Sequence, residues 1–332
     1  MRIIIPMAGL GKRLRPHTFT TPKPLLPIAG KPIVQRLVED IIKIYEDPIE
    51  EIAYVIGDFG KEVEHNLLSI AEKAGAKGTI YYQEQALGTA HAIWCAKNSI
   101  SEGVIIAFAD TLFRANFKLD QSKDGVIWVK SVEDPRNYGV VTLNEEGIIK
   151  ELVEKPQKFV SDLAIIGIYY IRNSDLLLEK VQYLLDNDLR YKGEYQLTDA
   201  LELMRKEGAK FVPGAVIDWM DCGNKELLLE TNAKILTHLS KQNQTASTAQ
   251  IRESVIIPPC YIGENVQIEK SIIGPYVSVG NDSVVKNSVI KDSIVREAVT
   301  VEGAVLSDSM LGNNACFKKA FQEIDLGDYS NA

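Results

Sequence analysis

A cluster of cationic side chains follows the first apolar run of the sequence. Two glycines, Gly9 and Gly11, precede Lys12, Arg13 and Arg15. Glycine lets the backbone approach a ligand closely, and backbone N–H groups combined with guanidinium and ammonium groups bind phosphate oxygens. The spacing lacks the third glycine of a dinucleotide fingerprint and the G-x-x-x-x-G-K pattern of a P-loop. The loop therefore predicts a triphosphate site of another kind, with a solvated basic loop as the alternative.

A further cation, Lys23, lies in a segment rich in proline. Five prolines occur between residues 16 and 32, and two of them flank Lys23 directly. Because the proline ring fixes φ, this backbone loses little further entropy when it orients the lysine. The segment therefore predicts one preorganised positive charge shortly after the glycine-rich loop.

Carboxylates and another lysine occur where predicted strands end. Asp110 follows the apolar run at 104–108, and ligands of an open α/β sheet bind at the carboxyl ends of its strands. The alternative for Asp110 is a helix cap, which is a frequent use of aspartate. Glu154-Lys155-Pro156 is compatible with a binding site or with an ordinary turn. The residue types alone leave these alternatives open.

The segment from residue 9 to residue 32 resembles the signature of sugar nucleotidyltransferases. The matching pattern is G-x-G-x-R-[Leu/Met]-x-P-x-T-x-x-x-P-K-P. Glucose-1-phosphate thymidylyltransferases, UDP-glucose pyrophosphorylases and mannose-1-phosphate guanylyltransferases share it. The resemblance extends nearly from end to end, because several branches of that family carry a C-terminal left-handed β-helix. It implies an enzyme that joins a nucleoside triphosphate and a sugar 1-phosphate into a nucleotide sugar and pyrophosphate.

The resemblance also implies roles for individual residues. Those of the catalytic centre are Arg13 and Lys23. Those that bind the nucleotide are Gly9, Gly11, Lys12, Gln83, Gly88 and Thr89. Those that bind the sugar phosphate are Tyr138, Gly139, Glu154 and Lys155. Those that hold Mg²⁺ are Asp110 and Asp221, with Asp218 as the alternative to Asp221.

The implied reaction needs no general base. The attacking oxygen belongs to a phosphate monoester, whose second pKa is about 6, so it is largely deprotonated at neutral pH. The four histidines accordingly form no recognisable constellation. The reaction does require in-line positioning and neutralisation of two anionic reactants, which Mg²⁺ with Arg13, Lys23 and Lys155 would supply.

The base and the sugar are less well defined. We expect dTTP or UTP with glucose 1-phosphate, with a mannose-1-phosphate guanylyltransferase or an amino-sugar uridylyltransferase as alternatives. Residues 87–92 are more similar to uridylyl- and guanylyltransferases than to the best-known thymidylyltransferases. Two other classes fit less well. An acyltransferase would use a histidine on its β-helix, and none follows His238, whereas a regulatory subunit would lack lysines such as Lys23.

The overall composition disfavours several partners. The formal net charge is −8, which opposes binding to nucleic acid. No apolar run approaches the roughly 20 residues of a membrane span, and the first run is too short for a signal peptide. The four cysteines lack the spacing of a metal site or a disulfide framework. We therefore expect a cytoplasmic protein with reduced thiols that acts on small molecules, without nucleic acid or membrane.

The elements that must position these residues form two domains and a linker. Over residues 1–238, β-branched runs alternate with helix-period segments, which predicts a Rossmann-like mixed α/β sheet. Successive strand patterns over 125–171 predict an antiparallel excursion within it. Residues 239–250 lose the apolar periodicity and are predicted to form a linker.

Residues 251–332 repeat aliphatic side chains at intervals of five or six positions. The unit Ile262-Gly263-x-x-Val266-x-Ile268 returns as Ile273-Gly274-x-x-Val277-x-Val279. Hexapeptide repeats of this kind predict a short parallel β-helix with a C-terminal tail, and a β-sandwich is the alternative. Because the ends and faces of a β-helix are usually covered by another surface, we expect a homo-oligomer.

Overall fold

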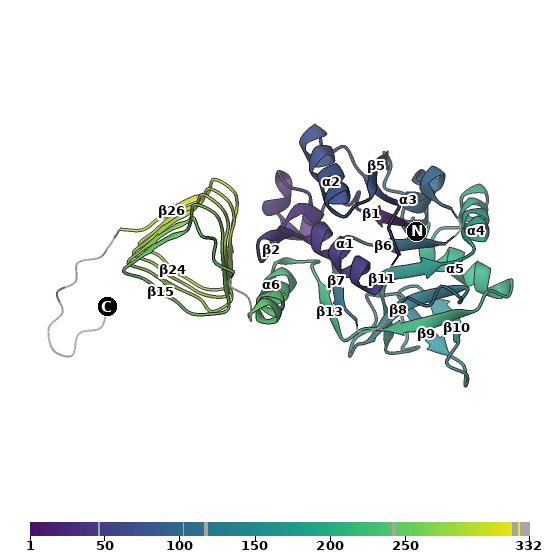
Figure 1. The fold of residues 1–332 in the computed structure, drawn as a ribbon. Helices are drawn as coiled ribbons and strands as arrows, with labels where there is room; N and C mark the ends of the chain where they lie inside the picture. The colour runs from purple at the N-terminus through teal and green to yellow at the C-terminus, as the bar shows by residue number, and fades with distance from the viewer. Residues whose placement is uncertain (46, 102, 116–118, 241–243, 321–324, 326–332) are drawn as a thin grey trace. The chain divides into compact units, whose positions relative to one another are not determined.

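The computed structural model describes residues 1–45, 47–101, 103–115, 119–240, 244–320 and 325. The chain divides into two compact units (Figure 1). The first consists of Met1–Leu26 and Ile33–Cys222, and the second of Pro27–Pro32 and Gly223–Ala332. A short N-terminal segment thus belongs to the unit that the C-terminal part of the chain forms.

A nine-stranded mixed sheet is the centre of the first unit. Its main path is β10 (Ile149–Val153), β9 (Val140–Leu143), β11 (Leu163–Ile171), β6 (Val104–Ala107), β1 (Arg2–Pro6), β4 (Glu51–Ile56) and β5 (Lys77–Tyr82). β8 (Gly125–Ser131) pairs with β11, and β12 (Phe211–Ala215) pairs with β8. Strands β6, β1, β4 and β5 are parallel, whereas β11 is antiparallel to β6, β8 and β9. The predicted α/β fold is confirmed, including its antiparallel excursion.

Helices flank this sheet in the described part of the unit. They are α1 (Ile33–Ile44), α2 (Lys61–Lys73), α3 (Thr89–Cys95), α4 (Ser174–Asp186) and α5 (Leu197–Lys206). Ile3, Ile4 and Ile5 are all fully buried, as expected for a parallel strand that is covered on both faces. Side chains of α3, α4 and α5 share one apolar core with β1 and β6.

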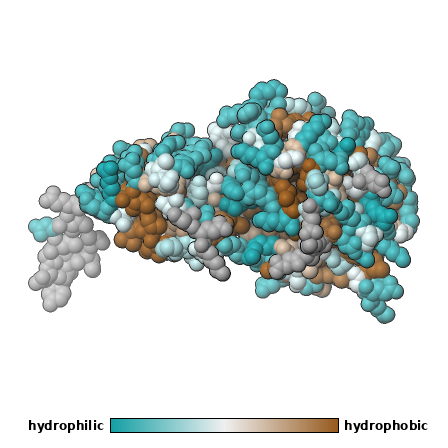
Figure 2. All heavy atoms as spheres, in the orientation of Figure 1, coloured by the Kyte–Doolittle hydropathy of each residue, from teal (hydrophilic) through white to brown (hydrophobic). Residues whose placement is uncertain are grey.

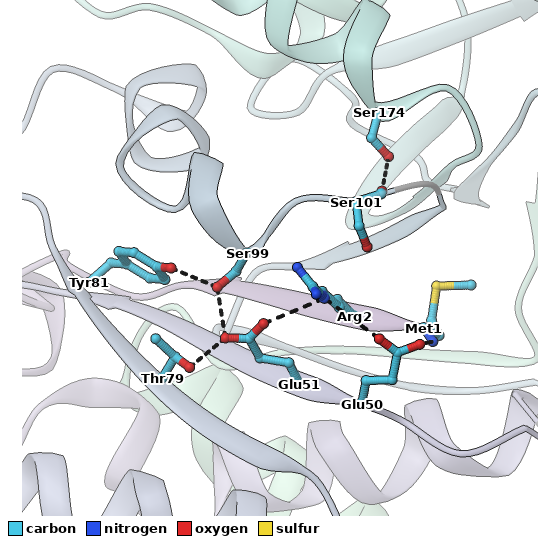
Figure 3. A network of polar contacts seen from close by, with 9 residues as sticks. All are labelled: Met1, Arg2, Glu50, Glu51, Thr79, Tyr81, Ser99, Ser101 and Ser174. Carbon is cyan, nitrogen blue, oxygen red and sulfur yellow. Dashed lines mark hydrogen bonds and ion pairs between the residues drawn. The ribbon is translucent and has the colours of Figure 1, made fainter.

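Polar side chains meet at the amino ends of β1 and β4, as Figure 3 shows. The carboxylate of Glu51 accepts hydrogen bonds from the hydroxyls of Thr79 and Ser99, and it lies 3.5 Å from Nε of Arg2. Ser99 in turn shares a hydrogen bond of 2.7 Å with Tyr81. Glu51 is only 8% exposed, and a buried carboxylate is tolerated only with such partners. The polar groups at this edge of the sheet are therefore engaged with one another. The carboxyl ends of the parallel strands lie at the opposite edge.

A small antiparallel ribbon joins two distant parts of the first unit. It pairs β7 (Thr111–Arg114), which follows β6, with β13 (Asp218–Asp221). The register places Asp221 opposite Thr111 and Asp218 opposite Arg114. The two candidate carboxylates of β13 therefore lie at opposite ends of this ribbon.

A left-handed parallel β-helix dominates the second unit, and Figure 1 shows its triangular coils. One face stacks β14 (Gln250–Arg252), β17 (Gln267–Glu269), β20 (Val284–Lys286), β23 (Thr300–Glu302) and β26 (Cys316–Lys318). A second face stacks β15 (Val255–Ile256), β18 (Ile272–Ile273), β21 (Val289–Ile290) and β24 (Val305–Leu306). The third stacks β16 (Cys260–Ile262), β19 (Val277–Val279), β22 (Ser293–Val295) and β25 (Met310–Leu311). The repeated aliphatic positions form its core, so the β-helix prediction is confirmed and the β-sandwich alternative is not.

The boundaries of the compact units differ from the predicted domain limits. The units divide after Cys222, so α6 (Lys225–Leu239) belongs with the β-helix. Within the predicted linker 239–250, Thr245 already pairs with Ile262, and the N–H of Ala246 donates to the carbonyl of Ile262 at 2.8 Å. These residues belong to the first coil of the β-helix. Residues 241–243 of the linker and most of the predicted tail lie outside the described residues.

The N-terminal contribution to the second unit is a hairpin. It consists of β2 (Pro27–Ile28) and β3 (Lys31–Pro32), which are antiparallel. Ala29 and Gly30 form its turn with φ of 44° and 81°. Two consecutive left-handed residues are typical of the tight type I′ turn of two-residue hairpins. Residues 27–32 will be called the signature hairpin, because they end the segment that carries Lys23.

Candidate functional site

A large cleft of about 1210 Å³ opens at the carboxyl ends of the parallel strands of the first unit. Its walls come from the residues that follow β1, β4, β5 and β6, namely Met7–Gly11, Gly57–Lys61, Gln83–Glu84 and Phe108–Asp110. Residues 18–24 form a further wall. This is the edge at which open α/β sheets bind ligands.

The glycine-rich loop is held from behind by the lysine segment. Gly11 adopts φ 57°, and its carbonyl accepts a hydrogen bond of 2.9 Å from the hydroxyl of Thr18. A Cβ on Gly11 would lie 3.1 Å from Cβ of Lys23, whereas a Cβ on Gly9 would meet no atom within 4 Å. Gly11 is therefore needed for packing, and Gly9 faces open space that a ligand could occupy.

Lys23 forms an ion pair with Asp110 in the wall of this cleft. Nζ of Lys23 lies 2.9 Å from Oδ2 of Asp110. The lysine begins a short 3-10 turn, Lys23–Leu25, and its side chain is 15% exposed, against 44% for that of Asp110. The ammonium is thus partly desolvated and preorganised, and the carboxylate still has a free face toward solvent.

The antiparallel ribbon brings the backbone of Asp221 close to that of Asp110. The N–H of Cys222, the next residue, donates to the carbonyl of Asp110 at 2.9 Å. Asp218 lies instead beside Arg114, at 3.6 Å. Among the described residues no group of three or more His, Cys, Asp or Glu side chains gathers as a metal site would require. A pair of carboxylates is nevertheless compatible with Mg²⁺, which usually takes one or two carboxylates and completes its shell with waters and substrate phosphates.

Tyr138 connects Asp221 with the glycine-rich loop. Its ring packs edge-on against Trp219, with 4.9 Å between the ring centroids. Burial raises the pKa of Tyr138, and the charge and hydrogen bond of Asp221 raise it further, while the positive charge of Arg13 opposes them. The phenol therefore stays protonated, and Arg13 is close enough to act on it electrostatically.

Glu154 and Lys155 form a second cluster with Gly139. Nζ of Lys155 lies 2.9 Å from Oε1 of Glu154, and the hydroxyl of Thr198 donates to Oε2 at 2.8 Å. A Cβ on Gly139 would come within 3.1 Å of that oxygen. Lys155 has a left-handed φ of 41°. A non-glycine residue in this region is strained, which is a feature that clusters at functional sites.

Gln83 is oriented by two hydrogen-bond acceptors. Its Nε2 lies 3.0 Å from the carbonyl of Gly88 and 3.1 Å from Nδ1 of His91. Burial lowers the pKa of His91, so the neutral imidazole is favoured and its Nδ1 can accept. Both amide hydrogens of Gln83 are therefore occupied, and the oxygen Oε1 is the atom that a ligand in the cleft can use.

Gly88 and Thr89, which were predicted to bind the nucleotide together with Gln83, also make contacts that stabilise the fold. Gly88 has φ 110°, and a Cβ there would lie 2.5 Å from the carbonyl oxygen of Tyr195. The hydroxyl of Thr89 accepts from the N–H of Leu197 at 2.8 Å. The predicted nucleotide segment thus joins the start of α3 to the start of α5.

The predicted site residues fall into two groups. Those that line the cleft are Gly9, Gly11, Lys23, Gln83, Gly88, Thr89 and Asp110. Those that do not line it are Lys12, Arg13, Tyr138, Gly139, Glu154, Lys155 and Asp221. Burial raises the pKa of Tyr169, and the charges of Asp110, in the first group, and of Glu154, in the second, raise it further.

Several residues of the site were missed in the sequence. Thr198 could have been found from the sequence. It belongs to a group of polar residues, 196, 198 and 199, at the start of the helical pattern of α5, and such a group is a candidate for binding. His91 lies on α3 between apolar positions and carries no signal of its own. Tyr169 lies in the apolar strand β11, where nothing distinguishes it from a core residue.

Comparison with known proteins decides the family. Residues 2–238 match the model of a family described as nucleotidyl transferase. The chain belongs to this nucleotidyl transferase family. It is an enzyme of the sugar-1-phosphate nucleotidyltransferase class. In the described ranges of this nucleotidyl transferase, no helix is long and apolar enough to cross a membrane.

Individual relatives of this nucleotidyl transferase carry several names. The chain is 30% identical over 258 residues to the low-salt glycan biosynthesis nucleotidyltransferase Agl11 of Haloferax volcanii, which covers 74% of this chain and 70% of that protein. It is 27% identical over 310 residues to a glucose-1-phosphate thymidylyltransferase of Streptomyces griseus, covering 86% and 84%. Among solved structures, a UDP-glucose pyrophosphorylase in complex with UDP-glucose matches with a TM-score of 0.59 and 26% identity, over 71% of this chain and 98% of the other.

Proposed function

We propose that this enzyme joins a nucleoside triphosphate and a sugar 1-phosphate into a nucleotide sugar with release of pyrophosphate, in a Mg²⁺-dependent reaction. The observation that carries the proposal is the pairing of Lys23 with Asp110 in the wall of the cleft, with Asp221 on the adjoining strand. Opposite charges held together at the carboxyl edge of the sheet suit a reaction between two polyanions.

The roles of the charged residues follow from their surroundings. Asp110 and Asp221 would hold Mg²⁺, which when bound neutralises phosphate charge. Lys23 and Arg13 would stabilise the negative charge of the transferring α-phosphate and of the leaving pyrophosphate. Lys155, oriented by Glu154, would hold the phosphate of the sugar, whose oxygen attacks without a general base.

We propose that the base is uracil or thymine. The available atom of Gln83 is its acceptor oxygen, because Nε2 is occupied by Gly88 and His91. An acceptor oxygen can take a hydrogen bond from the ring N–H of uracil, thymine or guanine, whereas cytosine and adenine offer only their exocyclic amino groups as base donors. The relatives' names favour thymidylyl or uridylyl transfer to glucose 1-phosphate, with a guanylyltransferase for mannose 1-phosphate and an amino-sugar uridylyltransferase as alternatives.

The test is a screen for pyrophosphate release with ATP, GTP, CTP, UTP and dTTP against a panel of sugar 1-phosphates. We expect activity with UTP or dTTP and glucose 1-phosphate, and its loss when EDTA removes the metal. Release with CTP alone would contradict the role of Gln83. The absence of release with every pair, in protein that is folded by circular dichroism, would refute the proposed reaction.

We also propose that the chain forms a homo-oligomer through its β-helix. Figure 2 shows apolar residues gathered on part of the surface, and the face made by β15, β18, β21 and β24 carries a row of exposed aliphatic side chains. They are Val255, Ile272, Val289 and Val305, with exposed fractions of 55%, 40%, 39% and 83%. An apolar row of this kind is suited to a second copy of the same face. A cytoplasmic location is supported by the four cysteines, which all lie in the described residues and form no disulfide there.

A further inference from the structure

The signature hairpin is bound by a buried asparagine of the second unit. The N–H of Ala29, in the turn, donates to Oδ1 of Asn232 at 2.9 Å. Asn232 lies on α6 and is fully buried. A buried amide of this kind is costly to leave without partners, so the contact constrains where the turn can lie.

The same amide is tied to the β-helix. The hydroxyl of Ser278, in β19, donates to Oδ1 of Asn232 at 2.7 Å, and Nδ2 of Asn232 lies 3.5 Å from the carbonyl of Tyr276. Oδ1 therefore accepts from the hairpin and from the β-helix at once. Through one side chain, the position of the hairpin depends on a coil of the β-helix.

The tip of the hairpin is also confined by contact with an aromatic ring. A Cβ on Gly30 would lie 2.1 to 2.6 Å from ring atoms of Tyr261, which is in β16. The backbone of the turn therefore lies directly against this ring. Together, Asn232 and Tyr261 hold the turn by a polar contact and by a steric one.

The hairpin is connected to Lys23 by a short and stiff segment. The N–H of Ile33 donates to the carbonyl of Leu26 at 3.1 Å and closes the base of the hairpin, and the N–H of Leu26 donates to the carbonyl of Lys23 at 3.0 Å. Pro24 and Pro27 restrict the backbone between them. Two prolines and two backbone hydrogen bonds thus limit how much of a shift of the hairpin can be absorbed before it reaches the 3-10 turn of Lys23.

We propose that Asn232 is a positioning residue for nucleotidyl transfer. Together with Ser278, it seats the signature hairpin on the β-helix and thereby fixes the backbone turn that carries Lys23. The inference rests on the proposed function for the catalytic part of Lys23. The β-helix is then a support of the catalytic lysine, in addition to any part that it has in assembly.

The test compares two serines that are equally buried but have different hydrogen-bond partners. Ser278 and Ser288 are both 3% exposed in the β-helix, and the hydroxyl of Ser288 bonds to the backbone of Lys286 and Ala304 in the β-helix. We expect Ser278→Ala and Ser288→Ala to shift the melting temperature by comparable amounts. Only Ser278→Ala should lower kcat, by roughly 3- to 10-fold, because small displacements of a reacting group are costly in rate. Asn232→Ala should lower kcat further.

A double-mutant cycle identifies the route of the effect. If Asn232 and Ser278 act through Lys23, then Ser278→Ala in a Lys23→Ala background should change kcat no further. Equal kcat for wild type, Ser278→Ala and Asn232→Ala would overturn the inference. So would an equal fall in kcat for Ser288→Ala, or full additivity with Lys23→Ala.

A readout without turnover separates this inference from the proposed function. Hydrogen exchange of residues 23–26 should be faster in Ser278→Ala than in Ser288→Ala. If the wild type is inactive but shows this difference in exchange, the proposed reaction is refuted, whereas the positioning of the Lys23 turn by Asn232 and Ser278 is supported. An active wild type without the difference would refute this positioning and keep the reaction.

Discussion

The cleft of the first unit and the β-helix of the second use their polar groups in opposite ways. In the β-helix the serines satisfy their neighbours: the hydroxyl of Ser254 accepts from the N–H of Ser271, that of Ser271 from Ser288, and that of Ser288 from Ala304. Each coil repeats this contact, and the exposed remainder includes a row of aliphatic side chains. The described lining of the cleft shows no such repetition: the side chain of Asp110 stays 44% exposed, and the hydrogen bonds of the Gln83 side chain are made by Nε2. Regular structure consumes its own hydrogen-bonding capacity, whereas a binding site must leave some of it for the ligand.

The largest effect on turnover is expected at Lys23, in the wall of the cleft. Lys23→Ala should lower kcat by roughly 10²- to 10³-fold, because one preorganised charge at a developing phosphoryl centre commonly supplies that factor. Pyrophosphate release measures the effect. Lys43→Ala is the control, since Lys43 pairs with Asp40 and lies outside the cleft. Near-normal turnover of folded Lys23→Ala protein would remove the catalytic assignment.

A smaller effect is expected at the ribbon. Asp221→Asn should raise the Mg²⁺ concentration needed for half-maximal rate at least roughly tenfold, because changes even beyond the direct ligands of a metal weaken binding by that order. Asp218→Asn is the matched control on the same strand, where it faces Arg114. The reverse result, with Asp218→Asn impaired and Asp221→Asn unaffected, would show that the metal binds at the Asp218 end of the ribbon and that the assignment to Asp221 is wrong.

A third difference, in the free energy of unfolding, is expected between Gly88 and Gly9, two glycines of the predicted nucleotide site. Gly88→Ala should destabilise the fold by about 1–3 kcal/mol through overpacking against Tyr195 and an unfavourable φ. Gly9→Ala should leave the free energy of unfolding nearly unchanged, because its Cβ would meet no atom within 4 Å. Urea denaturation of both variants measures this. Equal destabilisation would mean that the space beside Gly9 is not open.

The smallest effect on catalysis is expected on the β-helix surface. Val289→Lys should disrupt a homo-oligomer by placing a charge in the apolar row, while kcat changes little. Gln267→Lys, exposed on another face, is the control with the same new side chain. Light scattering gives the mass of each variant. A monomeric wild type, or an oligomer that both variants leave intact, would exclude this face as the interface.

Much of this protein could be predicted from local patterns. The β-helix follows from aliphatic residues that return every five or six positions, because each coil repeats the same local geometry. The strand and loop that carry Gly9 and Gly11 follow from an apolar run next to glycines. The family signature, residues 9–32, is likewise contiguous in sequence, so no tertiary information is needed to find it.

The contacts between segments that are distant in the sequence could not be predicted from local patterns. The sequence favoured Asp221 and left Asp218 as the alternative, and the antiparallel register of β13 with β7 places Asp221 at the end of the ribbon next to Asp110 and Asp218 at the other end. The placement of the signature hairpin in the second unit depends on Asn232, a residue about two hundred positions away. Periodicity reports which face of an element is buried, but it carries no record of the partner that buries it. Pairing register and side-chain contacts across the chain are set by packing, and packing exists only in three dimensions.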